Sequence, residues 1–253
     1  GRMPDADKAE RLTDKVAVVT GGGRGIGRAI ALALAREGAD ICVVARTESQ
    51  IGSVSEEIRD LGRKALAVSA DVTDQEQVEA MAKAVRDAFG RVDILVNDAG
   101  GGIEPKPVLE SDPDLWVKDV EVNLIGAYRV TRSLLPLMVS AGGGRIINLG
   151  SGMGHQSGAG SSAYRIGKAG LWMLTRCLGE ELWEQGIEVN ELIPGPVETD
   201  LTRPRMTAGG PPPFAPSERV KLPDEVVPLA LYLATQPPGG PTAQSFSLTR
   251  RPI

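Results

Sequence analysis

Short runs of β-branched and other apolar residues alternate along this chain with longer segments that have the periodicity of an amphipathic helix. Six such runs are predicted to be strands, at residues 15–20, 40–45, 65–69, 92–96, 145–149 and 187–193. The segments between them are predicted to be helices, at residues 26–37, 48–61, 74–89, 113–139 and 162–184. Apolar strands that alternate with helices predict a parallel sheet covered on both faces. Right-handed crossovers then give a doubly wound α/β fold.

The chain of 253 residues has the length of one α/β domain, and no linker or internal repeat divides it. We therefore expect a single domain over residues 1–253, with residues 1–12 as a flexible polar tail. Residues 201–221 contain five prolines and two glycines, which exclude a regular helix throughout. Because this stretch follows the sixth strand, a mobile flap over a site is favoured over a disordered insert.

The composition excludes several classes of partner. A net charge of −5 lacks the basic surplus of a nucleic-acid-binding protein. No apolar run reaches the length of about 18 residues that a membrane span needs, and the start of the chain has no signal-peptide core. Cys42 and Cys177 lie among apolar residues, so we expect two buried, unpaired thiols in a reducing compartment. The chain is therefore expected to be soluble and cytoplasmic.

A glycine-rich loop joins the first strand to the first helix, and it reads Thr-Gly-Gly-Gly-Arg-Gly-Ile-Gly over residues 20–27. Glycines let backbone amides approach a pyrophosphate closely, and the following helix N-terminus favours its negative charge. A plain glycine-rich turn is the alternative, but the strand before the loop and the helix after it favour nucleotide binding. The candidate cofactor-binding residues of this loop are Gly21, Gly23, Arg24, Gly25, Ile26 and Gly27.

The end of the second strand predicts which dinucleotide is preferred. An acidic residue there accepts hydrogen bonds from a ribose 2′-hydroxyl, whereas an arginine favours a 2′-phosphate. Here the strand ends at Arg46, with no carboxylate before Glu48, and Arg24 lies within reach in the loop. We therefore expect NADP(H) to be preferred, with NAD(H) still possible. The alternative is that both arginines are solvated surface residues.

Tyr164 and Lys168 are four residues apart on a predicted helix and so share a face. A phenol is a weak acid at neutral pH, and a nearby ammonium stabilises its ionised form. Ser151 follows the fifth strand, where an α/β sheet places ligand-binding groups. A Tyr-x-x-x-Lys pair alone is common on solvated helices, so its combination with the glycine loop is what marks these residues as catalytic candidates.

With these residues, the chain resembles the short-chain dehydrogenase/reductase family in its compact subgroup. The resemblance extends from about residue 12 to residue 233. Its closest general similarity is to 3-oxoacyl-carrier-protein reductases and related carbonyl reductases. Besides the loop, Ser151, Tyr164 and Lys168, the resemblance rests on the Asn-Asp-Ala-Gly at residues 97–100 and on further motif residues. The residues concerned are Asp71, Val72, Asn97, Ala99, Gly100, Asn123, Pro194, Gly195, Val197 and Thr199.

The resemblance implies a single-domain Rossmann-type fold with about seven strands, in a dimer or tetramer. It implies that Tyr164 is the acid or base, that Ser151 orients the substrate oxygen, and that Lys168 binds the cofactor ribose and stabilises the Tyr164 phenolate. Asn123 would hold a water of the proton relay. Asp71 and Val72 would contact the adenine, Asn97, Ala99 and Gly100 would line the adenosine side, and Thr199 would hold the carboxamide. Pro194, Gly195 and Val197 would also bind the cofactor.

The resemblance therefore predicts an NADP(H)-dependent oxidoreductase that reduces a ketone or aldehyde to an alcohol. Two alternatives stay open: an NAD-dependent alcohol dehydrogenase that works oxidatively, and a cofactor-binding regulator without catalysis. The substrate would be a small carbonyl compound or alcohol.

Some residues depart from the family pattern. Asp98 replaces an asparagine and needs hydrogen bonds or a raised pKa, and Glu191 in the sixth strand is expected at an exposed position or in a subunit salt bridge. His155 is the lone histidine, so no metal site is expected. The end of the chain is also atypical, although a seventh strand is plausible over residues 245–248.

Overall fold

The computed structural model describes residues 10–203, 206–212, 215–251 and 253. Its centre is a seven-stranded parallel sheet in the order β3-β2-β1-β4-β5-β6-β7. The strands are β1 (Val16–Thr20), β2 (Asp40–Ala45), β3 (Ala65–Ser69), β4 (Ile94–Asn97), β5 (Gly144–Leu149), β6 (Ile187–Ile193) and β7 (Ser245–Ser247). Val18 of β1 pairs with Cys42 of β2 on one side and with Leu95 of β4 on the other, so the strand order reverses at β1. The predicted single-domain, doubly wound fold is confirmed.

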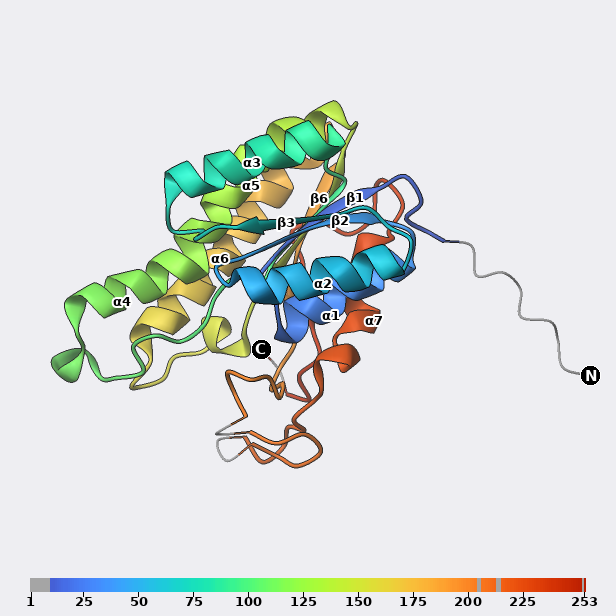
Figure 1. The fold of residues 1–253 in the computed structure, drawn as a ribbon. Coiled ribbons are helices and arrows are strands. Elements are labelled where there is room, and N and C mark those ends of the chain that lie inside the picture. The colour runs from blue at the N-terminus through green and yellow to red at the C-terminus, as the bar shows by residue number, and fades with distance from the viewer. Residues whose placement is uncertain (1–9, 204–205, 213–214, 252) are drawn as a thin grey trace, which may run out of the picture.

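Helices cover both faces of this sheet (Figure 1). One face carries α1 (Gly25–Arg36), α2 (Glu48–Asp60) and α7 (Val227–Ala234), and its core includes Ile30, Ile58 and Leu233. The other face carries α3 (Gln75–Phe89), α5 (Gly126–Ser140) and α6 (Ser162–Leu182), and its core includes Met81 and Leu134. The strands run between these two cores, which is why they are apolar on both sides.

The helix expected over residues 113–139 is present but interrupted. It consists of α4 (Pro113–Val120), a π-helical turn η2 (Glu121–Ile125) and α5. Single π-helical turns occur inside α-helices, and this one contains no helix-breaking residue, so the sequence pattern did not reveal it. The pattern also missed α7, an apolar segment of eight residues whose periodicity is weak.

The segment after β6 follows the expectation of an irregular excursion. Val197 and Lys221 form an isolated parallel bridge at its base. Between them, the described residues form turns and loops, tied where the Gly209 amide donates to the Val220 carbonyl at 3.0 Å. We keep the name flap for residues 201–221. Residues 204–205 and 213–214 of the flap lie outside the described residues.

Two smaller expectations concern the tail and the thiols. Residues 1–9 of the expected tail lie outside the described residues, whereas Leu12 is buried in the core and Arg11 pairs with Glu37. Both cysteines are free, and burial raises the pKa of the Cys42 thiol to about 12. Cys177 was expected to be buried, but it lies exposed on α6, so that expectation was wrong. None of the helices in the described ranges is both long and apolar enough to span a membrane.

Candidate active site

A cleft runs along the carboxyl edge of the sheet, where segments that follow all seven strands contribute to its walls. This edge, near the reversal of strand order at β1 and β4, is where open α/β sheets bind ligands. Tyr164 and Lys168 of α6 also line the cleft. The topology therefore gathers residues that are far apart in the sequence into one site.

The glycine loop forms one end of the cleft, directly before α1. At Gly27, an added Cβ would lie 2.3 Å from the Gly21 carbonyl oxygen and 2.8 Å from Asp98 Oδ2, so no larger residue fits. At Gly21, whose φ is +66°, a Cβ would lie 2.9 Å from the Asp98 carbonyl. The loop is thus folded tightly onto the segment after β4, and its backbone faces the cleft beside the N-terminus of α1. This cradle fits a dinucleotide diphosphate.

Arg24 and Arg46 both line the cleft near this end and are exposed. Within the described part of the chain, neither guanidinium forms an ion pair or a side-chain hydrogen bond. Arg46 does act on Asp71 of the same cleft. Burial alone would raise the Asp71 pKa, but hydrogen bonds from Thr73 and the charge of Arg46 lower it below its usual value. The two cations are therefore available to an anionic ligand.

Asp98 lies beneath the glycine loop and accepts a hydrogen bond from the Gly27 amide. Burial raises its pKa to about 7, although the nearby Lys168 ammonium and the Gly27 amide favour the charged form. The expectation of hydrogen bonding or a raised pKa for Asp98 is thus confirmed on both counts. Asp98 thus lies between the glycine loop and Lys168, in surroundings whose burial favours its neutral form.

Ser151, Tyr164 and Lys168 all line this cleft. The Lys168 ammonium is buried, donates to the Leu149 carbonyl at 2.7 Å and lies 5.9 Å from the centre of the Tyr164 ring. Ser151 Oγ accepts from the Met153 amide at 3.1 Å, which leaves its hydroxyl proton for another partner. The strand β5 and the helix α6 thus present a phenol, an ammonium and a hydroxyl to one space.

Asn123 lies in the π-turn η2, behind this trio. Its amide nitrogen donates to the carbonyls of Gly101 and Asp119 at 2.8 Å each, and its Oδ1 accepts from the Gly101 amide at 3.2 Å. An added Cβ at Gly100 would lie 2.6 Å from Asn123 Oδ1 and 3.5 Å from Lys168 Nζ. Asn123 therefore fixes the loop after β4 next to Lys168.

Asn97 is placed differently from the expectation that it contacts the cofactor. Its side chain is buried between β4 and the helical layer, where its amide donates to Asn148 Oδ1 at 2.9 Å and to Thr131 Oγ1 at 3.2 Å. Asp71, Val72, Ala99 and Gly100 do line the cleft, whereas Asn97 does not. Its hydrogen bonds fix the end of β4, and Ala99 and Gly100 follow shortly after it.

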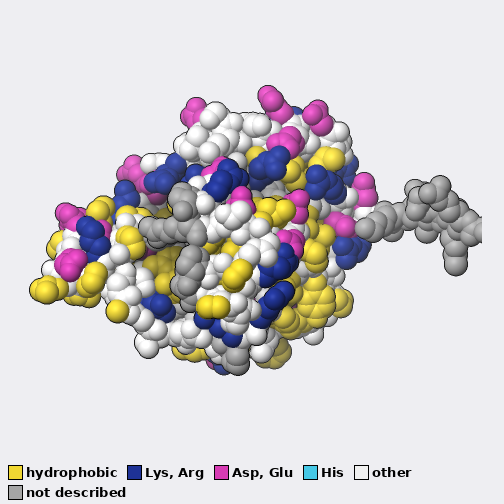
Figure 2. Space-filling model, turned by 90° about the horizontal axis from the view of Figure 1, so that it is seen from below, with side chains coloured by type: hydrophobic (Ala, Val, Ile, Leu, Met, Phe, Trp, Pro, Cys, Tyr) yellow, Lys and Arg dark blue, Asp and Glu magenta, His cyan; other side chains and the backbone are white. Residues whose placement is uncertain are grey.

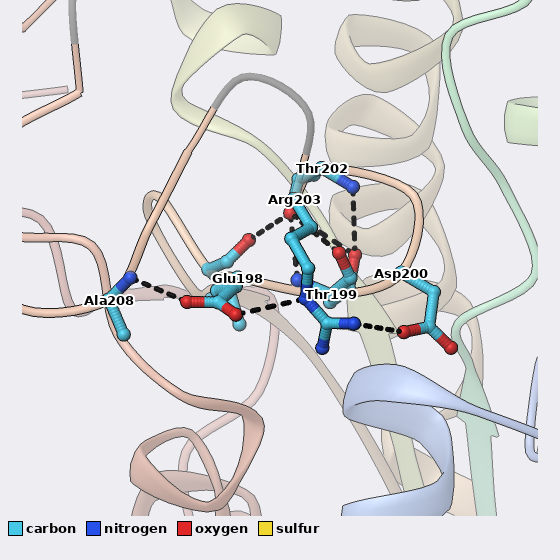
Figure 3. A network of polar contacts seen from close by, with 7 residues as sticks. Glu198, Thr199, Asp200, Thr202, Arg203 and Ala208 are labelled. Atoms are coloured by element: carbon cyan, nitrogen blue, oxygen red, sulfur yellow. Dashed lines mark hydrogen bonds and ion pairs between the residues drawn. The ribbon is translucent and has the colours of Figure 1, made fainter.

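The segment after β6 forms a further wall of the cleft, which is lined by Pro194, Gly195, Val197 and Thr199. Figure 3 shows how this wall is held. Glu198 accepts from the Ala208 amide at 2.6 Å and from Arg203 Nε at 3.1 Å, and these contacts lower the Glu198 pKa.

Thr199 is fixed within the same wall, where its amide donates to Thr202 Oγ1 at 2.8 Å. An added Cβ on Gly25 would lie 3.3 Å from Thr199 Cγ2, so this wall closes against the glycine loop.

His155 and Glu191 form a buried pair behind Ser151. His155 Nε2 lies 2.9 Å from Glu191 Oε2, Ser245 donates to the same oxygen, and the His155 ring packs on Trp172. Glu191 was expected to be exposed or in a subunit salt bridge, but it is fully buried, so that expectation was wrong. His155 lies in a short 3-10 turn η3 (Gly152–His155) that begins at Ser151. The pair therefore anchors this turn to β6.

Leu201 and Met206 belong to the flap that was expected over a site, but two other cleft residues were not predicted: Thr249 and Arg251. The sequence did contain a signal for Thr249 and Arg251. Residues that follow a parallel strand emerge at the carboxyl edge, so the expected seventh strand could have placed Thr249 and Arg251 at the site.

Comparison with known proteins adds to this geometry. Residues 15–208 match the family described as short chain dehydrogenase. An uncharacterised oxidoreductase of Mycobacterium tuberculosis is 38% identical, over 89% of this chain and 87% of the relative. A 3-oxoacyl-[acyl-carrier-protein] reductase of Synechocystis is 36% identical, over 94% of this chain and 96% of the relative. The crystal structure of a short-chain type dehydrogenase/reductase from Mycobacterium marinum superposes with a TM-score of 0.86 at 30% identity, covering 95% of this chain and 96% of that one.

Proposed function

The chain belongs to the short-chain dehydrogenase/reductase family of oxidoreductases, and on that premise we propose that it reduces a ketone or aldehyde to an alcohol with NADP(H). The observation that carries the proposal is the placement of Tyr164, Lys168 and Ser151 on one cleft with the glycine loop. The same step in reverse would oxidise an alcohol.

The residues of the cleft fit the cofactor along its length. The glycine loop would hold the diphosphate, Arg24 and Arg46 the 2′-phosphate, and Asp71 and Val72 the adenine. Ala99 and Gly100 would contact the adenosine side, Lys168 the second ribose, and the wall from Pro194 to Thr199 the nicotinamide. When bound, the dinucleotide supplies or accepts the hydride.

The remaining chemistry is proton transfer by the protein. Tyr164 would donate its phenolic proton to the carbonyl oxygen as the alcohol forms. Ser151 would donate a hydrogen bond to the same oxygen, since its Oγ already accepts from Met153. The buried Lys168 charge would stabilise the phenolate that remains. Asn123 Oδ1 keeps one lone pair for a water that returns the proton.

Replacing Tyr164 with phenylalanine tests the catalytic assignment. Because the proton donor is lost while the cleft keeps its shape, we expect kcat for a carbonyl substrate to fall by about 10²–10⁴-fold. The NADPH dissociation constant, measured by fluorescence titration, should change less than about twofold. Tyr232→Phe, on the exposed side of α7, is the matched control and should retain full activity. Unchanged turnover in Tyr164→Phe would refute the role of this residue.

The cofactor preference is a second, separate prediction. A unit charge pair at 4 Å contributes about 4 kcal/mol at an effective dielectric of about 20, and less where both arginines are exposed. We therefore expect kcat/KM to be at least about tenfold higher with NADPH than with NADH. The double variant Arg24→Ala, Arg46→Ala should bring the two values close together, whereas Arg36→Ala at the far end of α1 should not. Equal values in the wild-type protein would contradict the NADP(H) assignment.

A further inference from the structure

We propose that this enzyme's substrate carries a carboxylate as well as the reacting carbonyl, and that Arg251 binds that carboxylate. The inference rests on the proposed function and concerns one part of the cleft. We call this part the substrate end: it is formed by Gly152, Met153, Leu201, Met206 and Arg251, next to Ser151 and Tyr164.

The position of Arg251 follows from its neighbours in the chain. Thr249 packs on one wall, since its Cγ2 lies 3.4 Å from where a Cβ of Gly195 would be. Ile253 packs near the other, since its Cγ2 lies 3.8 Å from where a Cβ of Gly152 would be. Arg251 is thus held between the proposed nicotinamide wall and the turn that follows Ser151. Three strands of the sheet separate β1 from β7, so Arg251, which follows β7, leaves the cofactor phosphates to Arg24 and Arg46, which follow β1 and β2.

The chemistry of the substrate end is apolar apart from this guanidinium. Met153, Leu201 and Met206 supply apolar walls, and Figure 2, which views the molecule from the flap side, shows hydrophobic side chains exposed on this face. Lys168 also lies nearby, but its ammonium is buried and donates to the Leu149 carbonyl. Among the described residues that form the substrate end, Arg251 is therefore the group with a formal charge to offer.

The carboxylate of Glu218 lies beside Arg251 but does not use all the hydrogen-bond donors of its guanidinium. Glu218 is buried, and both its oxygens accept from the Arg250 amide, at 3.2 and 3.1 Å. Arg251 Nε lies 3.4 Å from Glu218 Oε1, and the Arg251 side chain remains 40% exposed. Its two terminal nitrogens have no acceptor within the described part of the chain. Glu218 also acts on the charge of Lys221, so it does not serve Arg251 alone.

A guanidinium with two free nitrogens matches the geometry of a carboxylate, which it binds through paired hydrogen bonds. The apolar side chains of Met153, Leu201 and Met206 in the same cleft fit an aliphatic or aromatic body. We therefore assign the substrate to the oxo acids, with the carbonyl at Tyr164 and the carboxylate at Arg251.

Matched pairs of substrates test this assignment. Straight-chain oxo acids with two to five methylene groups between ketone and carboxylate would be compared with their methyl esters, using NADPH oxidation. For at least one chain length we expect kcat/KM to be at least about tenfold higher for the acid, which corresponds to about 1.4 kcal/mol. Arg251→Met should abolish that preference through KM for the acid and leave the ester unaffected, and Arg251→Lys should restore part of it.

Arg250→Met is the matched control, because it removes the same charge from the adjacent residue while its backbone contact with Glu218 is kept. It should retain the wild-type preference. The inference is overturned if the wild-type protein prefers the ester at every length, if Arg251→Met keeps the preference for the acid, or if Arg250→Met loses as much. In each case turnover of the ester would leave the proposed function standing.

If none of these compounds is reduced, a binding measurement decides the inference, because it does not depend on turnover. Calorimetric titration of the corresponding hydroxy acids into the protein with NADP⁺ reports on the anion site directly. Binding that weakens at least about tenfold in Arg251→Met, and not in Arg250→Met, would support the carboxylate site. Equal affinity in all three proteins would overturn it.

Discussion

Asp98 couples the glycine loop to the proposed catalytic lysine through its ionisation. Its carboxyl accepts from the Gly27 amide and lies near Lys168, and burial raises its pKa from 3.8 to about 7. The folded protein therefore holds a proton that the unfolded chain releases between these two values. This contribution to stability is complete below about pH 4 and is lost as the pH rises through about 7.

Asp98→Asn should thus gain stability over the wild-type protein as the pH increases. The full shift corresponds to at most about 4 kcal/mol, and water in the cleft reduces it, so we expect the gain to grow by about 1–3 kcal/mol from pH 5 to pH 8. Urea unfolding of the cofactor-free protein at both pH values measures this. Asp71→Asn is the control: the Asp71 pKa is lowered, so that carboxyl is ionised in both states and its effect should be flat over this range. A pH-independent effect of Asp98→Asn would contradict the raised pKa.

At this scale the sequence predicted single residues only where a motif fixed their spacing. Tyr164 and Lys168 share a helical face by their separation alone, and Asp98 was identified because a carboxylate beside a packed sheet needs a partner. The pairing of His155 with Glu191 could not be predicted, since it joins a turn to a strand that is its neighbour only in the folded sheet.

At the level of elements, Glu191 joins β6 to the end of β5 and to η3. Its side chain occupies the space next to Gly150, where an added Cβ would lie 1.9 Å from Glu191 Oε1. Its other oxygen holds His155 of η3. The geometry of the turn after Ser151 therefore depends on a carboxylate from the adjacent strand filling the place of a missing side chain.

A double-mutant cycle would measure this dependence. Gly150→Ala alone should displace the Glu191 carboxylate and destabilise the protein by about 1–3 kcal/mol, as overpacking does. In a Glu191→Ala background the space is empty, so the same Gly150→Ala change should cost less. We expect a coupling free energy above about 1 kcal/mol from urea unfolding of the four proteins. Additive effects would show that the two residues do not compete for the space.

Elements with strong hydrophobic periodicity could be predicted from the sequence, whereas the π-turn and α7 could not. Strands and helices with strong periodicity appeared within a few residues of their expected ranges. The π-turn at Asn123 was hidden because its five residues, Glu121–Ile125, contain no proline or glycine that would mark a break in a helix. The helix α7 was hidden because its apolar run lacks a polar side.

For the whole molecule, alternation of strands and helices was enough to predict the layers and the handedness of the crossovers. It could not predict which side chains the flap and the last residues bring to the cleft. Those segments lack periodicity, and their positions depend on contacts such as Glu198 with Ala208 and Glu218 with Arg250.

The order of strands in the sheet also affects how the molecule can be assembled. Neighbours such as β1 and β4 are separated in the chain by two complete strand–helix units, so their pairing must close long loops. No N-terminal fragment that ends before α6 contains both parts of the cleft, the loop after β1 and the residues of α6. We therefore expect affinity for the nucleotide to develop late in folding, after the outer strands have joined the sheet. A chain truncated before α6 should bind the nucleotide only weakly.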